Sequence, residues 1–129
     1  MIDEFVSCSV CGAHASDSHH VVFRSQQPAL KKCQLNLIPL CHRCHYSIHH
    51  SNGARLDKQL KLKFQNKLEV FFLKEYLTSD EINEVLNISE RELNRLLKPL
   101  KMYKGKYSRE ETIRQIMGGR IILENEIEE

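Results

Sequence analysis

The sequence predicts an α+β protein with a small N-terminal domain over residues 1–54 and a mostly helical C-terminal half. Two observations support this division. All five cysteines and all seven histidines lie within the first fifty residues, where apolar runs are short. From Arg55 onward, apolar residues recur at helical spacing, and Ser or Thr precedes several of the expected helices.

Two Cys-x-x-Cys pairs frame the N-terminal domain: Cys8 with Cys11, and Cys41 with Cys44. Each spacing lets both sulfur atoms reach one ion from a tight turn, and two pairs complete a tetrahedral zinc site. Four thiolates leave no position for water, so we expect one structural Zn²⁺ that adds folding free energy to a short chain. The alternative is a set of unrelated core cysteines, which is our expectation for the unpaired Cys33.

The N-terminus lacks the basic region and the apolar run of a signal peptide, and no apolar stretch reaches membrane-spanning length. We therefore expect a cytoplasmic protein without a membrane partner. In that reducing setting, paired cysteines bind metal rather than form disulfides.

Between the cysteine pairs, the apolar runs Val21–Phe23 and Leu35–Leu40 predict two short strands that flank a loop. Adjacent residues of a strand point to opposite sides, so His19 and His20 can have different tasks. After the second pair, two further histidines stand four residues apart and would share one face of a helix.

The order His19-His20, Asn36 and His45 within the cysteine frame resembles the HNH endonuclease motif on a ββα-metal fold. The gaps of sixteen residues to Asn36 and nine residues to His45 fit that family. The phrases His-His-Val-Val-Phe-Arg-Ser and Asn-Leu-Ile-Pro-Leu-Cys are similar to small phage and prophage members, whose proteins would act in the host cytoplasm. The resemblance covers residues 5–50.

The resemblance implies a metal-dependent DNA endonuclease. His20 would be the general base that takes a proton from water, and Asn36 would orient His20 and tie the loop. His19 and His45 would bind a catalytic divalent metal ion, and His49 matches a frequent extra histidine near that metal. The ion would be Mg²⁺, Mn²⁺, Ni²⁺ or Zn²⁺, and the products would carry a 5′-phosphate and a 3′-hydroxyl.

The first half of the C-terminal region predicts a basic amphipathic helix that connects the two halves, over residues 55–76. Its apolar stripe consists of Leu56, Leu60, Phe64, Leu68 and Phe72. Such a stripe is core by default, but it can also bury against a second copy and form a homodimer.

Residues 77–120 predict a helix-turn-helix-like module. Thr78, Ser89 and Ser108 each have a glutamate three residues later, which predicts helices over 79–86, 90–98 and 109–117. Residues 102–107 predict a small hairpin, and residues 121–129 form an acidic tail.

This module is the expected DNA-binding part, because residues 91–109 carry seven basic side chains and one acidic side chain. Four polar residues share one helix face, as a recognition helix requires, and two lysines of the hairpin would hold the DNA backbone. The six residues are Arg91, Asn94, Arg95, Lys98, Lys104 and Lys106. The alternative is a helical cap whose charges face water.

Two further functions remain open at this point. One is a non-catalytic, zinc-containing DNA-binding regulator, which needs neither His20 nor Asn36. The other is an accessory nuclease of phage packaging or recombination, targeted by a partner protein. The stretch over residues 26–34 also departs from the glycine- and aspartate-rich loop of many HNH proteins, so its shape and DNA contacts are not implied.

Overall fold

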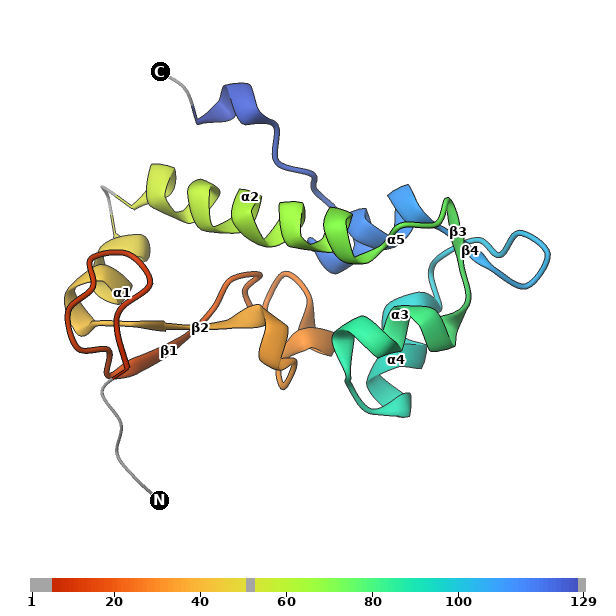
Figure 1. Cartoon of the computed structure of the whole chain (residues 1–129), viewed down its shortest axis with the longest axis horizontal. Helices are drawn as coiled ribbons and strands as arrows, with labels where there is room; N and C mark the ends of the chain where they lie inside the picture. The colour runs from red at the N-terminus through yellow and green to blue at the C-terminus, as the bar shows by residue number, and fades with distance from the viewer. Residues whose placement is uncertain (1–5, 51–52, 128–129) are drawn as a thin grey trace.

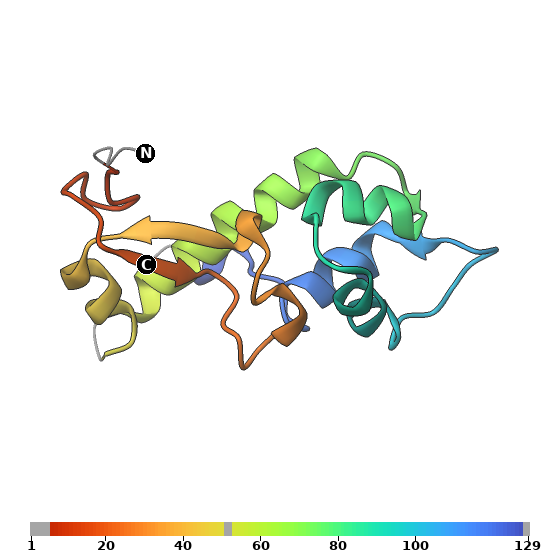
Figure 2. The same ribbon diagram turned by 90° about the horizontal axis from the view of Figure 1, so that it is seen from below.

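The computed structural model describes residues 6–50 and 53–127, which form five α-helices and two small antiparallel sheets. The described part is elongated, and the longest helix runs along its length (Figures 1 and 2). Residues 1–5 and 51–52 of the predicted 1–54 domain, and residues 128–129 of the predicted acidic tail, lie outside the described ranges.

The first sheet pairs β1 (Asp17–His20) with β2 (Leu37–Leu40) in antiparallel register. β2 falls within the second predicted strand, but the strand predicted at Val21–Phe23 is wrong, since β1 ends just before it. The reason is that the backbone of Val22 bonds to the buried side chain of Asn36 instead of a neighbouring strand.

The loop between β1 and β2 packs against the C-terminal half. It contains two short 3₁₀ helices, η1 (Pro28–Leu30) and η2 (Gln34–Asn36), and η1 contacts helix α4. The Cys33 thiol is buried and donates to the carbonyl of Leu86, 3.3 Å away, so its predicted packing role is confirmed. The two halves of the chain therefore share one apolar core.

Helix α1 (His42–Ile48) follows β2 directly, and α2 (Ala54–Phe71) begins against it. A side chain at Gly53 would place Cβ only 1.9 Å from the carbonyl oxygen of Ser47, so this close approach requires glycine. α1 and α2 both contribute residues to the core. The predicted core role of the apolar stripe is confirmed, because four of its five residues are buried and Leu56 is half-buried. Within this chain the stripe is therefore already covered.

α2 ends at Phe71, five residues before the predicted end. The chain turns there because β3 (Tyr76–Leu77) pairs with β4 (Tyr107–Ser108). The guanidinium of Arg109 donates to the carbonyl oxygens of Glu69 and Phe72, at 2.8 and 2.5 Å. These bonds satisfy groups that a helix C-terminus leaves open.

The three predicted short helices are confirmed within a residue at each end: α3 (Ser79–Leu86), α4 (Glu90–Leu97) and α5 (Arg109–Ile116). All three expected caps accept a hydrogen bond from the glutamate backbone N–H three residues later. Only Thr78 also shows the reciprocal bond from its backbone N–H to Glu81.

The segment after α5 runs back along α2. Gln65, buried on α2, donates to the carbonyl of Ile122 at 3.0 Å and accepts from its N–H at 2.8 Å. Further along, Glu126 pairs with Arg120 and Lys58. No helix in the described part of the chain is long and apolar enough to cross a membrane.

Replacing Gln65 with alanine would leave the buried N–H and C=O of Ile122 without partners. We expect this to lower the free energy of unfolding by about 1–3 kcal/mol. Gln59→Ala is the matched control, because Gln59 lies exposed on the same helix and should cost less than about 0.5 kcal/mol. Equal effects of both variants in urea unfolding would contradict this account.

Candidate functional site

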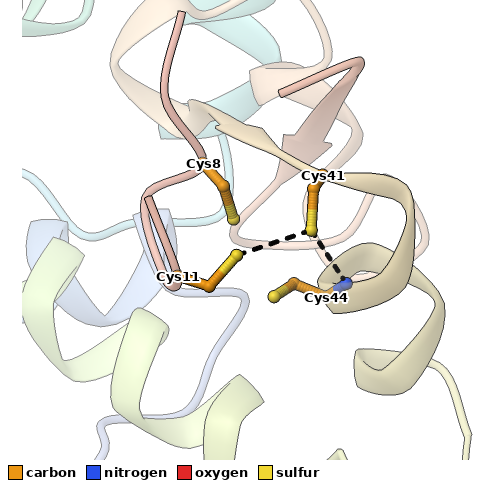
Figure 3. Close-up of side chains that lie close together, drawn as sticks. All are labelled: Cys8, Cys11, Cys41 and Cys44. Atoms are coloured by element: carbon orange, nitrogen blue, oxygen red, sulfur yellow. Dashed lines mark hydrogen bonds between the residues drawn. The ribbon is translucent and has the colours of Figure 1, made fainter. Parts of the chain in front are cut away.

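The four paired cysteines form a cluster. Their sulfur atoms lie within 4.8 Å of one another, and Figure 3 shows all four directed at a common centre. Cys8 and Cys11 come from the N-terminal loop, whereas Cys41 and Cys44 come from the start of α1. The sequence prediction is confirmed to this extent: the group could hold a structural metal ion such as zinc.

Local backbone geometry shapes both turns of the cluster. Gly12 has a positive φ of 81°, which closes the first turn after Cys11. The N–H of Val10 donates to the Cys8 sulfur at 3.4 Å, and the N–H of Cys44 donates to the Cys41 sulfur at 3.5 Å. Such N–H···S bonds favour the thiolate form that metals bind.

Two thiols of the cluster have opposite pKa shifts. Burial raises the pKa of Cys8, but hydrogen bonds from the backbone of Cys11, Cys41 and Val10 lower it more, to about 6. Burial and the neighbouring thiols raise the pKa of Cys44 to about 12. Four thiolates so close together repel one another, and a divalent cation would offset that repulsion.

A second cluster joins β1 to α1. Nitrogen atoms of His19, His45 and His49 lie within 4.8 Å of one another, so these three side chains could also hold a metal ion. The ring centroids are 5.1–5.7 Å apart. The family resemblance matches His49 only to a frequent extra histidine near the metal. In the structure it is a full member of the cluster, as close to His19 and His45 as they are to each other within the 4.8 Å limit.

His19 is the buried member of this cluster, with 1% of its surface exposed. Its Nε2 has no hydrogen-bond partner among the described residues. Burial, together with the charges of His45 and His49, lowers its pKa to about 4. The ring is therefore neutral near pH 7 and keeps a lone pair available for a metal ion.

Asp17 orients the second imidazole, and the sequence analysis missed it. The Nδ1 of His45 lies 2.8 Å from a carboxylate oxygen of Asp17. That hydrogen bond, followed by one from the hydroxyl of Ser16, lowers the pKa of the Asp17 carboxyl. With Nδ1 protonated, Nε2 is left as the free ligand atom. A signal was present, since Asp17 stands two residues before His19 and so shares its strand face.

His20, the predicted base, has its ring held by the loop. Its Nε2 lies 2.9 Å from the carbonyl oxygen of Lys31. A carbonyl can only accept, so Nε2 carries the hydrogen and Nδ1 carries the free lone pair. His20 is half-buried, and it lines the same open cleft as the buried His19.

Asn36 is fully buried and ties the loop, as the sequence predicts. Its Oδ1 accepts from the N–H of Val22 at 2.8 Å, and its Nδ2 donates to the carbonyl of the same residue at 3.0 Å. These bonds are to Val22 and not to the ring of His20. The expected orienting contact from Asn36 to His20 is therefore not a direct hydrogen bond, and the ring contacts the carbonyl of Lys31 instead.

The histidines line an open cleft of about 640 Å³. The other lining residues are Ser18, Phe23, Arg24 and Ser25. Arg24 is exposed and makes no ion pair with any residue in the described ranges. Sequence reasoning missed Arg24, although it belongs to the phrase that carried the family resemblance.

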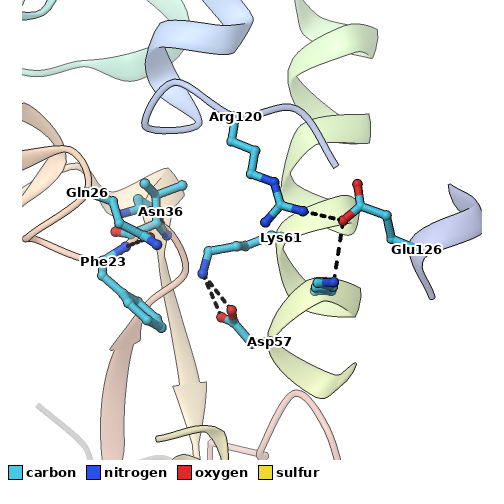
Figure 4. Close-up of polar contacts among 9 residues, drawn as sticks. Phe23, Gln26, Asn36, Asp57, Lys61, Arg120 and Glu126 are labelled. Carbon is cyan, nitrogen blue, oxygen red and sulfur yellow. Dashed lines mark hydrogen bonds and ion pairs between the residues drawn. The ribbon is translucent and has the colours of Figure 1, made fainter. Parts of the chain in front are cut away.

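Helix α2 supports one wall of this cleft (Figure 4). The ammonium of Lys61 is buried, contacts both carboxylate oxygens of Asp57 at 2.7 and 2.8 Å, and lies 3.9 Å from the ring centre of Phe23. The Phe23 ring in turn lies beside His19 and His49, with centroids 5.9 and 5.2 Å apart. The C-terminal half thus helps to position the histidine cluster.

The predicted DNA contacts are not brought together with the cleft. Arg91 and Arg95 on α4, and Lys98 at its C-cap, are exposed without an ion pair in the described part of the chain. Lys104 and Lys106 are exposed on the hairpin. Both elements lie at the end of the molecule away from α1 (Figures 1 and 2). Asn94 differs from its helix neighbours, because it lines a depression with acidic residues: Asp80, Glu84 and Glu90.

The chain matches no protein-family model, no curated protein and no solved structure.

We predict one tightly bound zinc ion per chain at the cysteine cluster, measured by elemental analysis in a His45→Ala background that removes a ligand of the second cluster. Cys41→Ser should lose this zinc and unfold the N-terminal half, because metal binding supplies folding free energy. Cys33→Ser is the control, since its hydroxyl can still donate to Leu86. A folded parent protein without zinc would contradict the assignment.

Proposed function

We propose that the protein is a metal-dependent DNA endonuclease of the HNH type. One observation carries the proposal: three histidine nitrogens converge within 4.8 Å on the wall of a cleft that also contains His20. A closed, structural metal site would not need a further histidine, with a free ring nitrogen, in an open cleft beside it. The hydrogen bonds of Asn36 add the loop-tying contact that the family resemblance implies.

The residues present fit a catalytic metal ion. The Nε2 of the buried His19 has no hydrogen-bond partner among the described residues. A ring nitrogen that binds a metal ion would have no such partner when the ion is absent. His45 and His49 complete a set of three imidazole nitrogen donors, which suits Zn²⁺ or Ni²⁺ better than Mg²⁺. When bound, the ion would neutralise charge on the scissile phosphate and the leaving oxygen.

His20 supplies the base. With its Nε2–H bonded to the carbonyl of Lys31, its Nδ1 can take a proton from a water molecule in the cleft. The fixed ring removes the need to reorient during the reaction, which helps a proton transfer. The water oxygen then attacks phosphorus as the P–O3′ bond breaks, and the leaving 3′-oxygen takes a proton from solvent. The products carry a 5′-phosphate and a 3′-hydroxyl.

Arg24 would hold the substrate phosphate. It is an exposed cation on the cleft wall, and no carboxylate of the described residues pairs with it. A guanidinium presents donors in a fork that matches two phosphate oxygens. No acidic side chain of the described residues lines the cleft. The two nearby carboxylates are engaged, Asp17 with His45 and Asp57 with Lys61.

The C-terminal part would bind DNA through a helix-turn-helix. α3 and α4 are joined by a short turn at Asn87. Arg91 and Arg95 on α4, with Lys98 at its C-cap, are exposed at the spacing of one helix face. This arrangement supports duplex recognition in a major groove. Asn94 lies in a depression with three carboxylates, which would repel the DNA backbone. We therefore assign the DNA contact of this face to Arg91, Arg95 and Lys98 alone.

The cleavage proposal is tested with His20→Ala. Removing the base should slow plasmid nicking by roughly a hundredfold or more at saturating metal, the usual scale for a general base. The measurement uses a panel of Mg²⁺, Mn²⁺, Ni²⁺ and Zn²⁺. His50→Ala is the matched control, since His50 is an exposed histidine of the same region that belongs to neither cluster.

Two results would count against the proposal. If His20→Ala cuts as fast as the parent, His20 is not the base. If the parent cuts neither DNA nor RNA with any of the four metals, the non-catalytic regulator replaces the nuclease.

The DNA-binding face is tested by replacing Arg91 and Arg95 together with alanine. Loss of two phosphate or base contacts should weaken duplex binding at least about tenfold at fixed salt. Lys63→Ala with Lys67→Ala removes the same charge from exposed positions on α2 and should have a smaller effect. Equal losses in both double variants, measured by fluorescence anisotropy, would favour a general charge effect over a recognition helix.

A further inference from the structure

The hairpin at residues 103–106 carries a pocket that is not part of the histidine cleft. Tyr103 and Lys106 exchange two backbone hydrogen bonds, at 2.7 and 3.1 Å. Lys104 and Gly105 both have positive φ, 54° and 82°, which is the geometry of a tight two-residue hairpin turn. The tip is therefore a defined structure, and it projects from the end of the molecule away from α1 (Figures 1 and 2).

Two tyrosines and two lysines line this pocket, which has a volume of about 650 Å³. The rings of Tyr76 and Tyr103 meet edge to face, with centroids 5.6 Å apart. The hydroxyl of Tyr103 donates to Glu111 at 2.8 Å, which fixes that ring. Tyr76 has 42% of its surface exposed, so much of its side chain remains accessible.

Apart from the Glu111 carboxylate at the Tyr103 hydroxyl, the charged groups on and beside the pocket lining are lysines. Lys104 and Lys106 are exposed on the lining, and the ammonium of Lys101 lies 5.0 Å from the ring centre of Tyr103. A ligand that satisfies both features needs a flat apolar face and a negative charge beside it. A nucleotide with an unpaired base has both, because the base can stack on an aromatic ring while its phosphates meet the lysines.

We propose that this pocket binds an unpaired base of single-stranded DNA. The exposed ring of Tyr76 stacks on the base, and Lys104 and Lys106 contact the flanking phosphates. A duplex supplies the phosphates but keeps its bases stacked on one another, so it cannot use the ring in this way. An acidic peptide would satisfy the lysines but leave the tyrosine faces without a partner.

This inference deepens the proposed function by naming a substrate class. A nuclease with its cleft at one end and a base pocket at the other would prefer DNA that combines the cut strand with an unpaired segment. The base pocket itself does not require cleavage, so its test is independent of the nuclease test.

The experiment measures binding of a fluorescent oligothymidine and of a duplex of matched length to the His20→Ala protein at fixed salt, without added divalent metal. Tyr76→Ala should weaken binding of the oligothymidine by roughly five- to a hundredfold, the scale of one stacked base, and change duplex binding by less than about twofold. Tyr76→Phe keeps the ring and should bind as the parent does. Zinc content and circular dichroism check that the variants are folded, and Tyr76→Leu replaces Tyr76→Ala if the latter unfolds.

Three results would overturn the proposal. Unchanged oligothymidine affinity in the folded Tyr76 variant excludes stacking. An equal loss for duplex and single strand indicates a backbone contact instead of a base pocket. Tighter binding of an oligouridine of the same length assigns the pocket to RNA. If the parent never cuts DNA but the Tyr76 effect is present, the nuclease proposal fails and the pocket remains.

Discussion

The two hydrogen bonds between the buried amide of Asn36 and the backbone of Val22 close the loop on which both parts of the molecule depend. On one side of this closure, β1 ends at His20 and the chain enters the cleft wall through Phe23. On the other side, the loop turns its apolar residues into the core shared with α4. Satisfying both the N–H and the C=O of Val22 requires a side chain with an acceptor and a donor, as in Asn36. Each buried backbone group left without a partner would lower the free energy of unfolding.

The histidine cluster depends on three separate elements that this closure holds in place. β1 supplies His19, α1 supplies His45 with His49 at its C-cap, and α2 supports the Phe23 ring through Lys61. A buried ammonium is tolerated there because Asp57 neutralises it and the aromatic face attracts it. The consequence is that the cleft is not a property of the N-terminal residues alone. Its wall is positioned by a helix that the sequence assigns to a connecting segment.

The cysteine cluster has a different character. Its four sulfur atoms all come from two tight turns in the N-terminal part, one in the N-terminal loop and one at the start of α1. A metal ion there would secure the outer end of the β1–β2 hairpin, close to the histidines but without access for a substrate. In the proposed nuclease, the closed thiolate set would hold the fold and the open imidazole set would perform the chemistry.

The predictions that succeeded from the sequence alone concern short-range patterns. The Cys-x-x-Cys spacing, the caps at Thr78, Ser89 and Ser108, and the limits of α3, α4 and α5 depend on interactions within a few residues, which any window of the sequence contains. The four-residue step from His45 to His49 is of the same kind. For the histidine cluster as a whole, the family resemblance indicated which residues would meet.

Only the tertiary structure decided the contacts between distant residues. Four features depend on where a remote segment lies: the position of β1 before the predicted strand at Val21–Phe23, the early end of α2, the pairing of Asp17 with His45, and the support of Phe23 by Lys61. A polar residue such as Asp17 or Lys61 has no local signature that distinguishes an engaged side chain from a solvated one. Its partner is chosen by the path of the chain, and that path is the outcome of packing the whole core.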